Sequence, residues 1–183
     1  MSAITEQIEA LFEQQGQTHY GENISQLEHA LQTAHLAFND GHGDYFIVAC
    51  LLHDIGHLHY AQGLAYRGID GEHEDLGANW LASGFPPEVT EPIRLHVAAK
   101  RYLCSIDDSY YDSLSLASKR SMLLQGGMMN PLEQKRFANN IYHIDAIKLR
   151  QYDDLAKIPD LEVNSFTTYL PMLERVSQNR DAG

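Results

Sequence analysis

Apolar residues recur every three or four positions along most of the chain, which is the spacing of amphipathic α-helices. This spacing predicts a first helix over residues 4–15, a second from Ile24 to a stop at Asn39-Asp40-Gly41, and a third from about Asp44 to Gly56. Further helices are predicted over the ranges 72–83, 87–100, 114–124, 131–139, 143–155 and 166–178. No segment shows the alternation of a half-buried strand, so the pattern predicts an all-α fold.

One stretch breaks the helical pattern. Residues 60–71 contain three glycines and are predicted to form a loop. The chain shows no internal repeat and no linker-like segment. Its 183 residues are enough for one well-buried core, so we predict one compact helical domain over residues 1–183.

Composition and charge narrow the function classes. The chain has 13 Lys and Arg against 25 Asp and Glu, a formal charge of −12, which argues against nucleic-acid binding. No apolar run approaches the roughly 18–20 residues of a membrane helix, and the first residues do not resemble a secretory signal. Cys50 and Cys104 do not make a disulfide framework. We expect a soluble, cytoplasmic protein without a membrane partner, either a monomer or a small homo-oligomer.

The chain contains ten histidines, and their positions suggest a metal site. His53 and Asp54 adjoin at the end of an apolar helix, where a buried carboxylate needs a partner such as a divalent metal. His29 alone could be an ordinary core or surface histidine, and Asp153 beside Asp154 could be solvated. His96 lies among aliphatic residues, so its ring nitrogens need partners if it is buried.

The order of these residues is more informative than any one of them. The series His29, His53-Asp54, His73, His96 and Asp153 resembles the H…HD…H…H…D signature of the HD-domain superfamily of metal-dependent helical proteins. Six ligands exceed the usual number for one ion, which favours two metals that share Asp54. Imidazole and carboxylate donors suit iron, manganese or zinc, and no cysteine lies nearby to form a thiolate site.

A closer resemblance covers roughly residues 18–155. These residues resemble the PhnZ-type oxygenases, which are HD-domain enzymes with a mixed-valent diiron centre that cleave the carbon–phosphorus bond of 1-hydroxyalkylphosphonates. The matching segments are Gly21–His29, Leu51–His57, Glu72-His73-Glu74, His96–Leu103, Leu114-Ser115, Ala117-Ser118, Gln125-Gly126-Gly127 and Arg150 with Asp153. The run from His96 to Leu103 is the most specific, and it separates this family from the hydrolytic members of the superfamily.

The resemblance implies a role for each ligand. One iron would be held by His29, His53, Asp54 and Asp153. The second would be held by Asp54, His73 and His96, with open positions for the substrate and O2. The Fe(II)/Fe(III) pair, bridged by Asp54, would use O2 to oxidise the substrate to phosphate and a carboxylic acid.

The same resemblance implies a set of residues around the substrate. Asp54, His57 and Lys100 would be catalytic. The substrate would be bound by Glu22, His57, Lys100, Ser118, Gln125 and Arg150. Lys100 and Arg150 would supply positive charge for the phosphonate dianion. His57 could instead cap the helix that ends near Gly56, and the role of Arg101 stays open.

One position departs from the family. A tyrosine that covers the open iron usually stands three residues before the glutamate equivalent to Glu22, but this chain has His19 there and Tyr20 next to it. Either residue could be the displaceable ligand. The substrate could be 2-amino-1-hydroxyethylphosphonate, hydroxymethylphosphonate or a trimethylammonium analogue. Four aromatic residues could form a cation cage or could be ordinary core and loop residues: Tyr45, Tyr60, Tyr66 and Trp80.

Two other functions compete with the oxygenase. Most HD-domain proteins hydrolyse phosphate esters, so a metal-dependent phosphohydrolase acting on a nucleotide or a small phosphate ester is the first alternative. A metal-stabilised binding or regulatory domain without turnover is the second.

Overall fold

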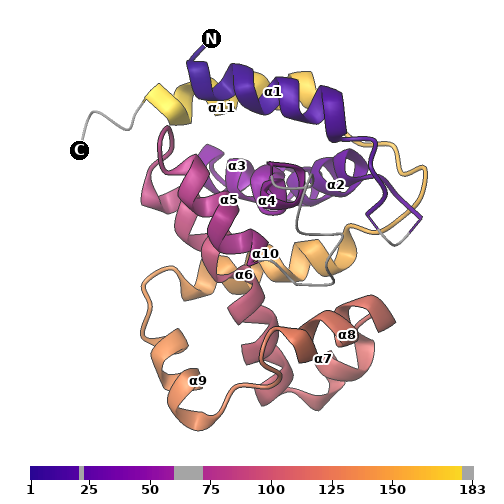
Figure 1. The fold of residues 1–183 in the computed structure, drawn as a ribbon, viewed down its shortest axis with the longest axis vertical. Coiled ribbons are helices and arrows are strands. Elements are labelled where there is room, and N and C mark those ends of the chain that lie inside the picture. Colours follow the sequence, from indigo (N-terminus) through magenta and orange to yellow (C-terminus); the bar gives the residue numbers. More distant parts are fainter. Residues whose placement is uncertain (21–22, 60–71, 179–183) are drawn as a thin grey trace.

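The computed structural model describes residues 1–20, 23–59 and 72–178, and this part of the chain holds eleven α-helices and no strand (Figure 1). The helices are α1 (Ala3–Gln15), α2 (Gln26–Asn39), α3 (Asp44–Leu52), α4 (Ile55–His59), α5 (His73–Leu81), α6 (Pro87–Ile106), α7 (Asp108–Ser113), α8 (Leu116–Leu124), α9 (Pro131–Ala138), α10 (His143–Leu155) and α11 (Phe166–Gln178). The prediction of an all-α HD-type bundle is confirmed. The predicted loop over 60–71 lies outside the described residues, and the single domain over 1–183 stays a prediction.

Helix α3 forms the centre of the core. Residues 47–52 are all buried, because this helix is apolar on every side. It contacts α2, α6, α10 and α11. Helices α1 and α11 lie side by side across one end of the molecule (Figure 1). Within the described residues, none of the helices combines the length and apolar character needed to span a bilayer.

Helix α3 ends earlier than predicted. It stops at Leu52 rather than at Gly56, and α4 begins at Ile55. The two residues between them, His53 and Asp54, form a turn. The break redirects the chain at the two residues that the sequence singled out as ligands.

Glycine allows α4 to approach α5 closely. A Cβ atom on Gly56 would lie 2.0 Å from the carbonyl oxygen of His73, which is backbone and has no freedom to move away. Gly77 of α5 faces the same contact, with its Cβ position 3.1 Å from the Gly56 nitrogen. The pair of glycines therefore fixes the start of α5, and with it His73, against the turn that carries Asp54.

Helix α6 joins the core to the other end of the molecule. It extends to Ile106, six residues beyond the predicted end at residue 100, and contacts α3, α5 and α10 as well as α7, α8 and α9. Helix α7 was not predicted. It begins because Asp107 is extended and its carboxylate accepts hydrogen bonds from the backbone N–H groups of Ser109 and Tyr110.

Candidate metal centre and substrate cavity

The six predicted metal ligands converge on one point inside the bundle. They come from α2, from the turn between α3 and α4, and from α5, α6 and α10, and all six are buried: His29, His53, Asp54, His73, His96 and Asp153. Buried carboxylates and imidazoles need partners. Their arrangement around one another is therefore the central feature of the molecule.

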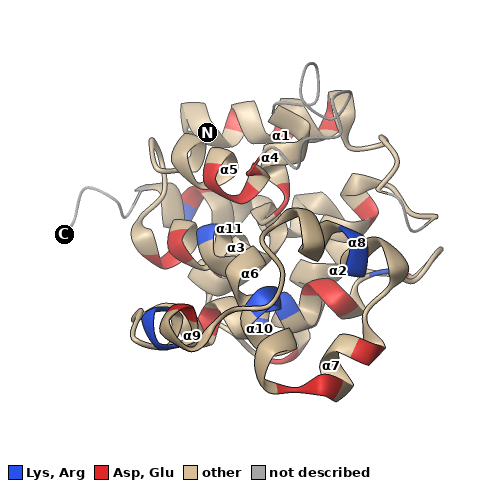
Figure 2. Ribbon diagram, turned by 60° about the horizontal axis from the view of Figure 1, so that its bottom comes forward, with Lys and Arg blue, Asp and Glu red and all other residues tan. Residues whose placement is uncertain are grey.

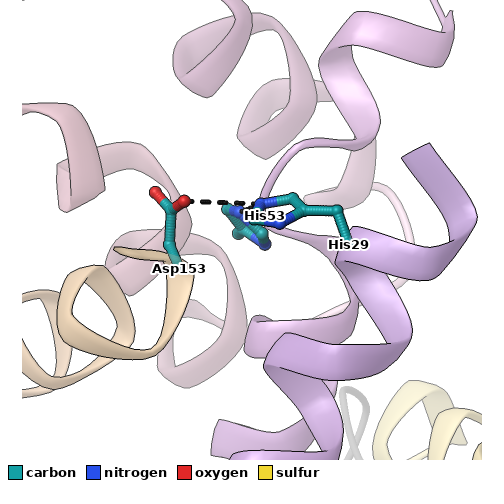
Figure 3. Close-up of side chains that lie close together, drawn as sticks. All are labelled: His29, His53 and Asp153. Carbon is teal, nitrogen blue, oxygen red and sulfur yellow. Dashed lines mark hydrogen bonds and ion pairs between the residues drawn. The ribbon is translucent and has the colours of Figure 1, made fainter. Parts of the chain in front are cut away.

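One half of the cluster surrounds the Oδ2 atom of Asp54. This oxygen lies 3.6 Å from His29 Nε2 and 3.4 Å from His53 Nε2. The two Nε2 atoms are 3.1 Å apart, and Asp153 Oδ1 lies 3.4 Å from His29 Nε2. Figure 3 shows His29, His53 and Asp153 pointing toward one another from separate parts of the fold.

The other half surrounds the Oδ1 atom of the same carboxylate. This oxygen lies 3.3 Å from His73 Nε2 and 3.6 Å from His96 Nε2, and these two nitrogens are 3.3 Å apart. Asp54 therefore presents one oxygen to each half, as a carboxylate that bridges two ions must do. The ring of His57 stacks on that of His73, with centroids 3.9 Å apart, and Asp54, His57 and His73 form a second group of potential ligands.

The rings are oriented by hydrogen bonds at their other nitrogen. Nδ1 of His29 lies 2.7 Å from the carbonyl oxygen of Ala156, and Nδ1 of His53 lies 2.9 Å from that of Cys50. Since a carbonyl only accepts, each Nδ1 carries the proton and each Nε2 presents a lone pair to the cluster. This is the tautomer that a metal ligand requires.

The surroundings of Asp54, Asp153 and His96 also favour the protonation states in which these side chains can bind a metal. Burial raises the pKa of Asp54, but His53 and other neighbours outweigh it and hold the pKa well below the usual value. Burial likewise opposes ionisation of Asp153, but Arg150 outweighs it and lowers the pKa of that carboxyl. Burial lowers the pKa of His96 strongly. The carboxylates are therefore ionised and His96 neutral at neutral pH, and the cluster fits divalent or trivalent cations with a preference for nitrogen and oxygen donors.

A cavity of about 180 Å³ opens beside the second half of the cluster. Asp54, His73 and His96 form its inner wall, and Lys100 and Arg150 add positive charge. Figure 2 shows how charge is distributed: the described Lys and Arg residues lie on α6 and the segments after it, whereas Asp and Glu occur both before and after the start of α6. The cavity thus lies where the predicted metal ligands meet the basic side chains of Lys100 and Arg150.

Comparison with known proteins identifies the family. The chain is 45% identical over 170 residues to the hydroxymethylphosphonate dioxygenase of Gimesia maris, in an alignment that covers 90% of this chain and 85% of the relative. It is 38% identical over 176 residues to the 1-hydroxy-2-(trimethylamino)ethyl phosphonate dioxygenase (glycine-betaine-forming) of Leisingera caerulea, covering 94% of this chain and 90% of the relative. No family model matches the chain. The chain belongs to the PhnZ-type HD-domain oxygenases.

This assignment confirms the prediction of an oxygen-dependent enzyme of phosphonate catabolism at the level of the family. Together with the two groups of potential ligands, it indicates a metal cofactor and O2 as the co-substrate of this PhnZ-type oxygenase.

The predicted substrate-binding residues of this oxygenase lie together, with one outside the described part. His57, Lys100, Ser118, Gln125 and Arg150 all line the cavity. Gln125 Oε1 is buried and has no hydrogen-bond partner among the described residues. A buried acceptor without a partner is suited to a ligand that donates to it. Glu22 lies outside the described residues, as do Tyr60 and Tyr66 of the suggested cage. Tyr45 and Trp80 do not line the described wall of the cavity.

The structure distinguishes between His19 and Tyr20. His19 is exposed, and its backbone pairs with that of Ser25. Tyr20 lines the cavity, its ring stacks on His29, and its hydroxyl lies 3.4 Å from Asp153 Oδ1. Burial, together with the charge of Asp153, raises the pKa of Tyr20, so the hydroxyl is protonated at neutral pH.

Arg150 has more partners than the sequence indicated. Its Nη1 lies 2.8 Å from Asp153 Oδ2, its Nε lies 3.1 Å from Asp154 Oδ2, and its Nη2 pairs with Asp154 Oδ1. Tyr110 of α7 donates a hydrogen bond of 2.5 Å to Asp154. Arg150 therefore orients Asp153, a predicted metal ligand, as well as facing the cavity.

Two cavity residues escaped the sequence reasoning. Ser121 accepts a 2.9 Å hydrogen bond from Lys100 Nζ. Lys157 lines the cavity from just beyond α10, with its Nζ 3.4 Å from Ser118 Oγ and 4.0 Å from Asp153 Oδ1. Helical spacing offered a signal for the lysine, because Arg150, Asp153 and Lys157 follow each other at intervals of three and four.

Proposed function

We propose that this protein is a mixed-valent diiron oxygenase that cleaves the carbon–phosphorus bond of a small 1-hydroxyalkylphosphonate. The carboxylate of Asp54 carries the proposal, because its two oxygens each face a separate pair of histidine Nε2 atoms. One ion would be held by His29, His53, Asp54 and Asp153, and the other by Asp54, His73 and His96. Bound iron would supply the redox chemistry with O2 that the reaction needs.

The cavity residues would bind and orient the phosphonate. Lys100 is almost fully buried, so its charge is shielded little by solvent and attracts an anion strongly. Ser118 and Gln125, which also line the cavity, would add hydrogen bonds. Lys157 would add a third cation, and its long contacts to Ser118 and Asp153 leave its amino group able to turn toward a ligand.

Tyr20 would occupy the substrate position in the resting enzyme. Its hydroxyl lies beside Asp153 and its ring lies against His29, so it closes the cavity at the metal centre. Substrate would displace the hydroxyl without disturbing the histidines, whose Nδ1 atoms are held by other groups. Tyr20, rather than His19, would be the displaceable ligand.

The overall reaction balances with O2 alone as oxidant. For hydroxymethylphosphonate, one O2 converts the substrate into formate and phosphate. The C–P bond breaks, the carbon is oxidised by four electrons, and both oxygen atoms of O2 are reduced into the products. No external reductant is consumed, because the substrate supplies all four electrons that reduce O2.

Aerobic and anaerobic assays test the proposal. Iron-loaded protein, confirmed as mixed-valent by electron paramagnetic resonance, is incubated separately with hydroxymethylphosphonate, 2-amino-1-hydroxyethylphosphonate and the trimethylammonium analogue, and phosphate is measured. We expect phosphate from at least one of the three, with matching O2 uptake and none without O2. Phosphate release from a phosphate ester in the absence of O2 would support the phosphohydrolase instead. No phosphate from any phosphonate would overturn the proposal.

A further inference from the structure

Gln32 of α2 is a polar side chain inside the core, only 2% exposed. Its Nε2 donates a 2.7 Å hydrogen bond to the carbonyl oxygen of Ile158, and its Oε1 accepts a 3.0 Å hydrogen bond from the N–H of the same residue. Burial of an amide is unfavourable unless its polar atoms are paired. Both ends of this amide are paired, with the backbone of a residue 126 positions later in the chain.

A second contact from α2 reaches the same segment. His29 precedes Gln32 by three residues, so the two side chains lie on one face of the helix. Nδ1 of His29 lies 2.7 Å from the carbonyl oxygen of Ala156. Ala156 is also held by α10, because its N–H donates to carbonyl oxygens in the last turn of that helix. The backbone is therefore anchored on both sides of Lys157, at Ala156 by two helices and at Ile158 by Gln32.

Lys157 lies between these two anchors, and its side chain lines the cavity. The side chain is 14% exposed, with its Nζ 3.4 Å from Ser118 Oγ and 4.0 Å from Asp153 Oδ1. A lysine side chain loses much conformational entropy when it is ordered. The place of its ammonium therefore depends on a backbone with a fixed position and direction.

Side-chain packing does little to hold the chain beyond Lys157. Residues 158–162 are all exposed, and Ile158 itself is 51% exposed. The two hydrogen bonds from Gln32 are therefore the main hold on Ile158 among the described residues.

We propose that Gln32 is a positioning residue that holds the Lys157 ammonium in the cavity, where it would face the phosphonate. This inference rests on the proposed function, which gives Lys157 its ligand. Gln32 would act through the backbone of Ile158, and it is not part of the cavity wall. Since Ala156 is held separately by α10, loss of the Gln32 amide should leave His29 in place and the metals bound.

Two variants on α2 separate positioning from stability. Gln32→Met removes both hydrogen bonds and nearly keeps the length of the side chain. Thr33→Val is the matched control, because the buried Thr33 hydroxyl donates a 2.8 Å hydrogen bond to the His29 carbonyl oxygen. This control also loses a buried hydrogen bond, but none to residues 156–158.

The measurements use zinc-loaded protein and need no turnover. Acetylation of Lys157 by acetic anhydride, followed by mass spectrometry, reports how often its side chain reaches solvent. Isothermal titration calorimetry gives the affinity for methylphosphonate, and metal analysis gives the zinc content.

We expect Lys157 to be acetylated several-fold faster in Gln32→Met than in the wild type. Methylphosphonate binding should weaken by roughly threefold to tenfold, because a charge-assisted contact is loosened rather than removed. Zinc content should not change. Thr33→Val should match the wild type in all three measurements.

A double-mutant cycle shows whether Gln32 acts through Lys157. In a Lys157→Met background, Gln32→Met should weaken methylphosphonate binding no further. The inference is overturned if the loss is equal in both backgrounds, if Gln32→Met loses zinc or leaves the acetylation of Lys157 unchanged, or if Thr33→Val shows the same changes. A wild type that does not bind methylphosphonate would also overturn it.

Failure of the proposed function would look different. A wild type that binds methylphosphonate but releases no phosphate from any of the three 1-hydroxyalkylphosphonates would defeat that function. The acetylation rates and the double-mutant cycle would still decide the role of Gln32.

Discussion

The ring of Tyr20 lies almost flat against the ring of His29, with centroids 3.8 Å apart and an angle of 20° between the planes. This stack places the tyrosine hydroxyl beside Asp153, in the wall of the cavity. A side chain in this place competes with any ligand that enters. Removing its hydroxyl is therefore the most direct test of how the cavity opens.

We expect Tyr20→Phe to bind methylphosphonate, an unreactive ligand, several-fold more tightly than the wild type, because one hydrogen-bond competitor worth about 1 kcal/mol is lost. Metal content should be unchanged. Isothermal titration calorimetry measures the affinity. His19→Ala is the control, since His19 is exposed. An equal change in the His19 variant would contradict the assignment of Tyr20.

Asp54→Ala should remove both metals, because each half of the cluster uses one oxygen of this carboxylate. The iron content after loading, measured by metal analysis, should fall from about two ions per chain to near zero. Asp145→Ala, an exposed position on α10, should keep the wild-type ratio. Retention of one tightly bound ion by Asp54→Ala would show that the two positions are independent of the bridge.

Lys100→Met should keep the metals and raise the KM for the phosphonate by tenfold or more, because a charge-assisted hydrogen bond contributes about 1.5–3 kcal/mol. Lys157→Met should have the same effect with a smaller magnitude, since its side chain is more exposed than that of Lys100. Lys135→Met on the exposed surface of α9 is the control. Steady-state kinetics and metal analysis measure both properties. Loss of iron from Lys100→Met would refute its role at the phosphonate.

Gly56→Ala should destabilise the fold by about 1–3 kcal/mol, the usual cost of overpacking, because its Cβ would overlap the His73 carbonyl. Displacement of α5 should also weaken the metal position that uses His73. Gly43→Ser is a suitable control, since a Cβ there meets nothing within 4 Å and serine is a good N-cap for α3. Chemical denaturation and zinc titration measure the two effects. Equal stability of the two variants would contradict the close approach.

The sequence predicted which residues lie together in the candidate metal centre better than it predicted the helix ends. The order of His29, His53-Asp54, His73, His96 and Asp153 was enough to select all six residues that the fold brings together. Helical periodicity gave no sign of the turn at His53 and Asp54, because apolar residues continue on both sides of it. That turn depends on packing against α5, which is a tertiary contact.

Other errors have similar physical causes. Helix α7 was missed because Asp107 starts a new helix directly after α6, and a one-residue separation leaves little trace in the apolar pattern. The sequence did not decide which of His19 and Tyr20 reaches the candidate metal centre, because the choice depends on the direction in which each side chain points. Pairing of His19 with Ser25 sets that direction. Lys157 emerged only once its partner Ser118, from a distant segment, was in place.

His96 and Lys100 are one helical turn apart on α6, and both line the cavity. The rise of an α-helix separates them by about 6 Å along the axis. The helix thus fixes the spacing of the two backbone positions whose side chains would face the metal and the phosphonate. A substrate with its hydroxyl on the carbon next to phosphorus would match the spacing of His96 and Lys100. One extra methylene between the hydroxyl and the phosphonate would move the phosphonate away from Lys100. Helix α6 would therefore select substrates by the distance between these two groups, before the reaction begins.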